Sequence, residues 1–200
     1  LSLKYLGIPF EHYKTSEWAI KSIQALKDLH YSCDNTDYTE GMTIAEVKSW
    51  LSGRISSDYS TPLNDKQIER LSEKEARKIY NNMRATHNLG SIMTINGNDL
   101  QIVDTDKFTY VLTYSFPCQD LSSAGTGAGM EKGSGTRSGL LWEVERLLKE
   151  TKELPQVLLT ENVPGVIGRK NINDFAEWVA FLDKLGYHSK WGLLNAKDFG

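Results

Sequence analysis

The stretch Tyr114-Ser115-Phe116-Pro117-Cys118-Gln119-Asp120-Leu121-Ser122 decides how this chain folds. The residues before it, 108–113, are aromatic and β-branched, which predicts a buried strand. A glycine-rich segment follows at 125–139. Pro117 fixes its own φ and has no backbone donor, so we expect it to end the strand. Cys118 is therefore predicted at the end of a strand, at the edge where open α/β sheets bind ligands.

A second strand pattern at 155–160 is followed directly by Glu161. Apolar residues at helical spacing over 140–148 lie between the two strand patterns. Strands joined by a helix are typically parallel neighbours, so Cys118 and Glu161 are predicted to meet at one edge of the sheet. Taken singly, each has a simpler interpretation. Most cysteines near strands are small buried hydrophobic residues, and a glutamate after a strand is commonly a surface residue.

The composition is that of a globular protein. The chain has 200 residues, of which 40% are hydrophobic and 24% charged. Its net charge of -3 excludes a general polyanion binder. A DNA-binding role would require Lys and Arg to be concentrated locally.

The two cysteines, Cys33 and Cys118, lie far apart, and no secretory signal is present. This pattern favours reduced thiols in a cytoplasmic protein over a disulfide. No apolar run is long enough to cross a membrane. No metal site is predicted, and the sequence gives no indication of the oligomeric state.

The first thirty residues predict a strand at 9–15 and a helix at 19–30, with Ser16 as its cap. Glu17 lies between them. An acid at the end of a second strand binds ribose in nucleotide-binding α/β folds. Alternatively, the dipole of the following helix would favour an acid here.

Residues 31–92 differ from their surroundings and are predicted to be a helical insertion. Two capping boxes, at 43–46 and 72–75, each precede a helical pattern, with a polar loop at 56–61 between them. Basic residues of this region could contact phosphates, but interleaved acids favour a solvated helix face. These basic residues are Lys66, Arg70, Lys74, Arg77, Lys78 and Arg84.

The end of the chain predicts a helix from Asn173 to a stop at Gly186, and a last strand at 187–194.

Four motifs together resemble those of the DNA cytosine-5 methyltransferases, in the order of that family. They are Phe-Pro-Cys-Gln-Asp-Leu-Ser at 116–122, Thr-Arg-Ser-Gly-Leu-Leu-Trp at 136–142, Glu-Asn-Val at 161–163 and Leu-Asn-Ala-Lys-Asp-Phe-Gly at 194–200. The resemblance implies an α/β fold: an incomplete Rossmann-like class I methyltransferase sheet with a helical insertion. It makes 1–200 a partial catalytic domain, without the target recognition domain.

The resemblance also implies a reaction. Cys118 would add to carbon 6 of a cytosine flipped out of double-stranded DNA, and S-adenosyl-L-methionine would donate a methyl group to carbon 5. Glu161 would hold the ring at nitrogen 3. A restriction–modification or phage-encoded enzyme is the expected setting.

Further residues match positions that contact cofactor or substrate in the family. Cofactor contacts are implied for Glu17, Trp18, Asp99, Leu100, Pro117 and Leu140. Substrate contacts are implied for Pro117, Gln119, Ser122, Arg137, Asn162 and Val163. Asp99 could instead simply cap the turn marked by Asn96 and Gly97. Lys132, like Arg137, gives the glycine-rich segment a positive charge suited to a backbone phosphate.

Two family motifs fall outside the chain: a glycine-rich loop expected before Leu1 and a Gln-x-Arg-x-Arg motif expected after Gly200. We therefore expect this chain alone to bind cofactor poorly and not to methylate. The alternatives are a tRNA cytosine-5 methyltransferase and a catalytically inactive fragment of the fold. A thiol hydrolase would need a histidine base, and all four histidines lie outside the strand-end sites.

Overall fold

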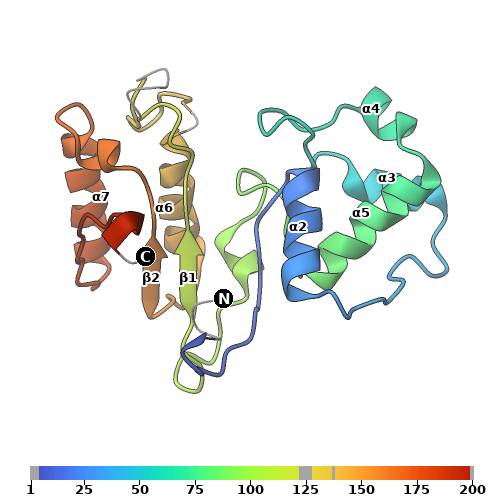
Figure 1. Cartoon of the computed structure of the whole chain (residues 1–200), viewed down its shortest axis with the longest axis horizontal. Coiled ribbons are helices and arrows are strands. Elements are labelled where there is room, and N and C mark those ends of the chain that lie inside the picture. The colour runs from blue at the N-terminus through green and yellow to red at the C-terminus, as the bar shows by residue number, and fades with distance from the viewer. Residues whose placement is uncertain (1–4, 122–127, 137, 199–200) are drawn as a thin grey trace. The chain divides into compact units, whose positions relative to one another are not determined.

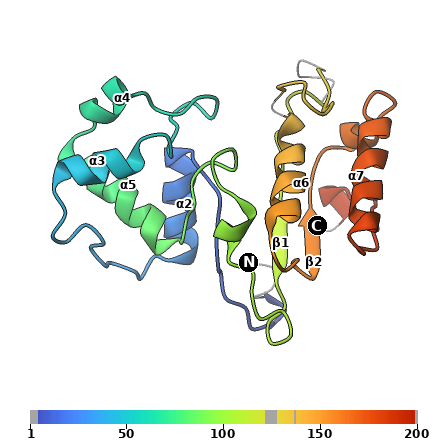
Figure 2. The ribbon, with the colours of Figure 1, turned by 180° about the vertical axis from the view of Figure 1, so that it is seen from behind.

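The computed structural model describes residues 5–121, 128–136 and 138–198. The chain divides into two compact units, Leu1–Ile95 (unit 1) and Asn96–Gly200 (unit 2), and each is described by itself (Figures 1 and 2). None of the helices in the described ranges is long and apolar enough to cross a membrane.

Unit 1 is helical. Within its described residues lie the helices α2 (Ile20–His30), α3 (Ile44–Leu51), α4 (Asp65–Arg70) and α5 (Glu73–Ala85), and both α2 and α3 pack against α5. The core between them consists of apolar side chains from all four helices and the connecting segments. It contains Ile23, Val47, Leu51, Ile55, Leu63, Ile68, Ala76, Ile79, Tyr80 and Met83.

Local hydrogen bonds set where these helices begin. Both expected capping boxes are confirmed, Thr43 with Glu46 on α3 and Ser72 with Glu75 on α5. In each, the hydroxyl accepts a backbone N–H of the first turn while the glutamate accepts the N–H of the capping residue. A third box, Asn64 with Gln67, begins α4, which the sequence analysis did not predict.

Two expectations near the start of unit 1 are wrong. Residues 9–15 do not form a strand, and only Thr15 makes an isolated parallel bridge, to Asn88. A strand needs a partner over several residues, and the segment after α5 supplies one for a single pair. Ser16 does not cap α2 either. Its hydroxyl donates to the carbonyl of Gly90 at 2.8 Å, and the helix begins after Ala19 without a side-chain cap.

Unit 2 is a mixed α/β structure around a two-stranded parallel sheet. β1 (Val111–Tyr114) and β2 (Val157–Thr160) pair in register from Val111 opposite Val157 to Tyr114 opposite Thr160. Helix α6 (Leu141–Glu150) connects the strands, and α7 (Ile172–Lys184) follows β2. Short 3₁₀ turns flank these elements: η1 (Gly97–Leu100), η2 (Ser138–Leu140), η3 (Pro164–Ile167) and η4 (Ala196–Asp198).

Among the described residues of unit 2, aromatic side chains of α6 and α7 pack on one face of this sheet. Tyr114 at the end of β1 meets Trp178 of α7 edge-on, with ring centroids 6.0 Å apart, and Trp142 of α6 meets the same indole at 6.4 Å. On the other face, Val111 is 47% exposed, Val157 44% and Leu159 60%. The expectation that both strands are buried is therefore wrong. A β-branched run predicts a strand, but it does not tell whether both faces are covered.

The expected last helix is confirmed as α7, beginning one residue early, and Gly186 follows it in the left-handed conformation with φ 92°. The expected strand at 187–194 is wrong, since this segment has no strand assignment. Leu193 and Leu194 are largely exposed. Without a neighbouring strand to share its backbone hydrogen bonds, an apolar run has no reason to become a strand.

Candidate active site

Cys118 and Glu161 follow the carboxyl ends of two neighbouring parallel strands. Tyr114 pairs with Thr160, so Cys118 lies four residues beyond the last pair on β1 and Glu161 one residue beyond it on β2. The predicted parallel neighbours are thus confirmed. Cys118 is a free, half-buried thiol, and Glu161 is exposed.

Hydrogen bonds connect the two strand ends. The side-chain amide of Asn162 donates to the carbonyl of Phe116 at 2.9 Å, and its oxygen accepts the N–H of Val163 at 2.9 Å. Asn162, beside Glu161, thereby holds the backbone two residues before Cys118. A side chain expected to contact substrate is engaged within the protein.

The turn that contains Cys118 also packs closely against η3. The carbonyl of Cys118 accepts the N–H of Leu121 at 3.0 Å, which closes the turn. A Cβ atom on Gly165 would lie 2.3 Å from the carbonyl oxygen of Leu121. Only glycine fits there. The segment after Glu161 and the turn after Cys118 are therefore in close backbone contact.

The same turn is held by the residues that lead into α6. The Ser138 hydroxyl donates to the carbonyl of Pro117 at 2.5 Å, and its backbone N–H donates to Oδ2 of Asp120 at 3.1 Å. Ser138 has no exposed surface, and Asp120 is 8% exposed. The sequence analysis did not single out Ser138 or Gly165. Glycine after Pro164 was a signal for Gly165. Ser138 lies inside the motif at 136–142, but the sequence analysis gave this residue no role of its own.

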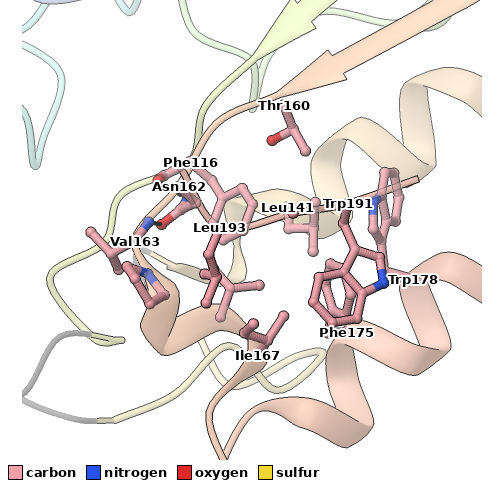
Figure 3. Close-up of a pocket in the computed structure, with 13 residues that line it drawn as sticks. Phe116, Leu141, Thr160, Asn162, Val163, Ile167, Phe175, Trp178, Trp191 and Leu193 are labelled. Atoms are coloured by element: carbon pink, nitrogen blue, oxygen red, sulfur yellow. Dashed lines mark hydrogen bonds between the residues drawn. The ribbon is translucent and has the colours of Figure 1, made fainter. Parts of the chain in front are cut away.

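A small cavity of about 120 Å³ lies beside these strand ends (Figure 3). Aromatic side chains from the segment after β1, from α7 and from the segment after α7 line it, including Phe116, Phe175, Trp178 and Trp191. Thr160, Asn162 and Val163 line it from the β2 side, but Cys118 and Glu161 do not. The cavity is therefore next to the predicted catalytic pair rather than around it.

Burial makes the tyrosine at the end of β1 harder to ionise than a free tyrosine. It raises the pKa of Tyr114 to about 12, although hydrogen bonds with Trp178 and Thr160 act in the opposite direction. Tyr114 is therefore a neutral phenol at physiological pH.

Lys132, which the sequence analysis considered suited to a backbone phosphate, is paired within unit 2. Its ammonium lies 2.6 Å from the buried carboxylate of Glu145 and 4.7 Å from the ring centroid of Trp142. Arg137 and Ser122, which were expected to contact substrate, lie outside the described residues. Gln119 is exposed.

The expected cofactor residues of unit 2 have structural partners of their own. Asp99 closes η1, because its Oδ2 accepts the N–H of Asn96 at 2.9 Å. This oxygen caps the turn, as the alternative interpretation of Asp99 predicted. Leu100 is buried. Leu140 is half-buried at the start of α6, and Pro117 is half-buried beside Cys118.

In unit 1, Glu17 and Trp18 are fixed mainly through their backbones. The N–H of Glu17 donates to the Asn88 side chain at 3.1 Å, and the carbonyl of Trp18 accepts the N–H of Ser56 at 2.7 Å. One carboxylate oxygen of Glu17 accepts the N–H of Ala19 at 2.7 Å, at the start of α2. The other has no hydrogen bond within the described part of the chain.

This chain resembles known proteins over most of its length. The profile of the family described as C-5 cytosine-specific DNA methylase matches residues 66–200, more than half of the chain. The chain belongs to that family. Cys118 and Glu161 both lie inside the matched region of this methylase chain.

Curated relatives of this methylase chain come from bacteria. The orphan methyltransferase M.SssI of Spiroplasma monobiae is 36% identical over 194 residues, which are 96% of this chain and 50% of that protein. The type II methyltransferase M2.ScrFI of Lactococcus lactis subsp. cremoris is 36% identical over 160 residues, 80% of this chain and 42% of that protein. The chain thus spans about half the length of these relatives or less.

Proposed function

We propose that the protein containing this chain transfers a methyl group from S-adenosyl-L-methionine to carbon 5 of cytosine in double-stranded DNA. The observation that carries this proposal is the position of Cys118 and Glu161 just past the paired ends of β1 and β2. Family membership and relatives named as type II methyltransferases support it, and they favour a restriction–modification setting. We also propose that the two-stranded sheet is part of a Rossmann-like methyltransferase sheet.

Cys118 would act as the nucleophile. Its thiolate forms a bond between Sγ and carbon 6 of cytosine, and the electron pair of the 5,6 double bond makes carbon 5 nucleophilic. A thiolate suits this step because it attacks readily and can leave again. After methyl transfer, loss of the carbon 5 proton expels the thiolate and restores the double bond.

Glu161 would stabilise the charge that develops on the ring during this attack. A carboxylic acid at ring nitrogen 3 donates a hydrogen bond to the position where electron density accumulates. Because the ring is inaccessible in a duplex, the nucleotide must be flipped out. Pro117, Gln119 and Val163, near the two strand ends, are the described residues proposed to line its path.

The chain has groups that fit the cofactor. Glu17 keeps one carboxylate oxygen without a partner among the described residues, which suits a ribose hydroxyl, and the half-buried Trp18 suits an adenine ring. Asp99, Leu100, Pro117 and Leu140 are proposed as further contacts. When bound, the cofactor supplies an electrophilic methyl group on sulfur.

Trapping on DNA that contains 5-fluorocytosine tests this proposal. Fluorine replaces the proton that must leave carbon 5, so the adduct with Cys118 should persist through denaturing electrophoresis. In the full-length protein, Cys118→Ser should abolish the adduct, whereas Cys33→Ser should leave it intact because Cys33 belongs to unit 1 and does not follow a paired strand. An adduct that survives Cys118→Ser, or methyl transfer to tRNA in preference to DNA, would overturn the proposal.

A further inference from the structure

The peptide between Pro117 and Cys118 is held by a buried group of atoms that the proposed chemistry does not use. The Ser138 hydroxyl donates to the Pro117 carbonyl, and the Ser138 N–H donates to the Asp120 carboxylate. The Asp120 carbonyl accepts the N–H of Gly129 at 2.9 Å. We call Ser138 and Asp120, with these bonds, the Pro117 clamp.

The clamp acts on the thiol through the geometry of the peptide bond. The carbonyl of Pro117 and the N–H of Cys118 belong to one planar unit, so fixing the carbonyl also fixes the plane from which Cys118 extends. The ring of Pro117 already fixes φ on the preceding side. Ser138 therefore removes the main remaining rotation before Cys118.

Burial makes this arrangement specific. Ser138 has no exposed surface, so water cannot replace its hydroxyl as the partner of the Pro117 carbonyl. Asp120 lies on the other side of Cys118 and ties the turn to the same residue of the segment before α6. Pro117, before Cys118, and Asp120, after it, thus both accept a hydrogen bond from Ser138.

We propose that Ser138 and Asp120 are positioning residues that hold Cys118 in the orientation needed for attack on carbon 6. This rests on the proposed function only for the identity of the attacked carbon. Small displacements of a reacting group cost about 100-fold in rate, so a clamp of this kind has a measurable consequence. Both residues are proposed to act through the backbone on either side of Cys118 and not by contact with cytosine or cofactor.

The clamp itself is tested by alkylation of the full chain with iodoacetamide, read at each cysteine by mass spectrometry. Ser138→Ala removes the hydroxyl and keeps the backbone N–H that binds Asp120. We expect alkylation of the half-buried Cys118 to become at least about fivefold faster, because the turn opens more often. Alkylation of the exposed Cys33 should not change, which gives an internal reference in the same molecule.

Two further variants sharpen this test. Ser134→Ala removes an exposed hydroxyl of the same segment that has no bond to the Cys118 turn, and should behave as the parent does. Asp120→Asn keeps an oxygen that can accept the Ser138 N–H but loses the charge, so its effect on Cys118 should be smaller than that of Ser138→Ala. If Ser138→Ala does not fold, Asp120→Ala, which removes both carboxylate oxygens, takes its place. Unchanged or slower alkylation of Cys118 in the clamp variant would overturn the proposal.

A second readout connects the clamp to the reaction. In the full-length protein, Ser138→Ala should form the 5-fluorocytosine adduct about 100-fold more slowly while the KM for DNA stays within about twofold. If the KM for DNA instead rose by as much as the rate of adduct formation fell, Ser138 would have a merely structural role, which would contradict the proposal. If the parent forms no adduct, the proposed function fails, and alkylation still decides whether the clamp exists.

Discussion

At the residue scale, a buried carboxylate on α6 organises the segment that follows the Cys118 turn. Glu145 is almost fully buried and pairs with Lys132 at 2.6 Å and with Lys149 one helical turn later. The indole N–H of Trp142 also donates to the carbonyl of Met130 at 2.7 Å. Residues 130–132 are therefore attached to α6 by two independent contacts.

These ion pairs predict a pH dependence of stability. Burial raises the pKa of Glu145, but hydrogen bonds from Lys132 and Lys149 outweigh it and leave the pKa below its usual 4.5. A depressed pKa in the folded state means that the ionised group stabilises the fold above pH 4.5. This contribution is lost as the pH falls through the folded-state value.

We expect Glu145→Gln to lower the free energy of unfolding at pH 7 by about 1–3 kcal/mol, because a charged hydrogen-bonding partner of two lysines is lost. Its stability should also change less than that of the parent between pH 6 and pH 3. Urea unfolding at several pH values measures both effects. Glu40→Gln changes an exposed glutamate that has no ion pair among the described residues, so its stability should depend on pH as that of the parent does. If the stability of Glu145→Gln also changed with pH as that of the parent does, the assignment would be contradicted.

At the element scale, η1 docks on the last turn of α6 through a glycine. A Cβ atom on Gly97 would lie 2.4 Å from both the carbonyl oxygen of Leu147 and the nitrogen of Thr151. The N–H of Gly97 donates to the carboxylate of Glu150 at 2.8 Å. The turn that contains Asp99 thus owes its position to backbone contact with the helix between the two strands.

Gly97→Ala should therefore destabilise unit 2 by about 1–3 kcal/mol, since the added methyl group forces backbone atoms apart. Gly192→Ala is the matched control, because a Cβ there would meet no atom within 4 Å. Thermal unfolding followed by circular dichroism compares the two variants. Equal melting temperatures would show that η1 can move away from α6 without cost.

The elements also show which predictions the sequence can support. The capping boxes of α3 and α5 depend on residues three positions apart, so a local pattern was sufficient. The parallel pairing of β1 and β2 followed from a strand–helix–strand pattern. The predictions of strands at 9–15 and 187–194 were wrong, because a strand needs a neighbouring strand that its own residues do not specify.

At the candidate site, sequence patterns predicted that Cys118 and Glu161 follow strands, but not the residues that hold their backbones in place. Cys118 and Glu161 were recognisable because each follows a strand pattern. The buried hydroxyl of Ser138 and the close approach at Gly165 arise only when distant segments pack together. The ion pair of Lys132 was not foreseen for the same reason, since its partner Glu145 lies on α6.

At the scale of the whole molecule, the proposed tasks divide between the two units. Glu17, the proposed ribose-binding acid, belongs to unit 1, and Cys118 belongs to unit 2. Each is held by contacts within its own unit: Glu17 by Asn88, and the Cys118 turn by Ser138 through Pro117 and Asp120. Substitutions at the two positions should therefore have separable effects.

In the full-length protein, Glu17→Gln should weaken binding of S-adenosyl-L-methionine about tenfold to a hundredfold, because a charge-assisted hydrogen bond is lost. The amide oxygen can still accept the N–H of Ala19, so α2 keeps its start. Alkylation of Cys118 should not change. Cys118→Ser should show the opposite result, with unchanged cofactor affinity and no adduct. Calorimetric titration gives the affinities, and Glu11→Gln, at an exposed acid six residues earlier, is the control. Unchanged affinity in Glu17→Gln would remove Glu17 from the cofactor site while leaving the role of Cys118 untouched.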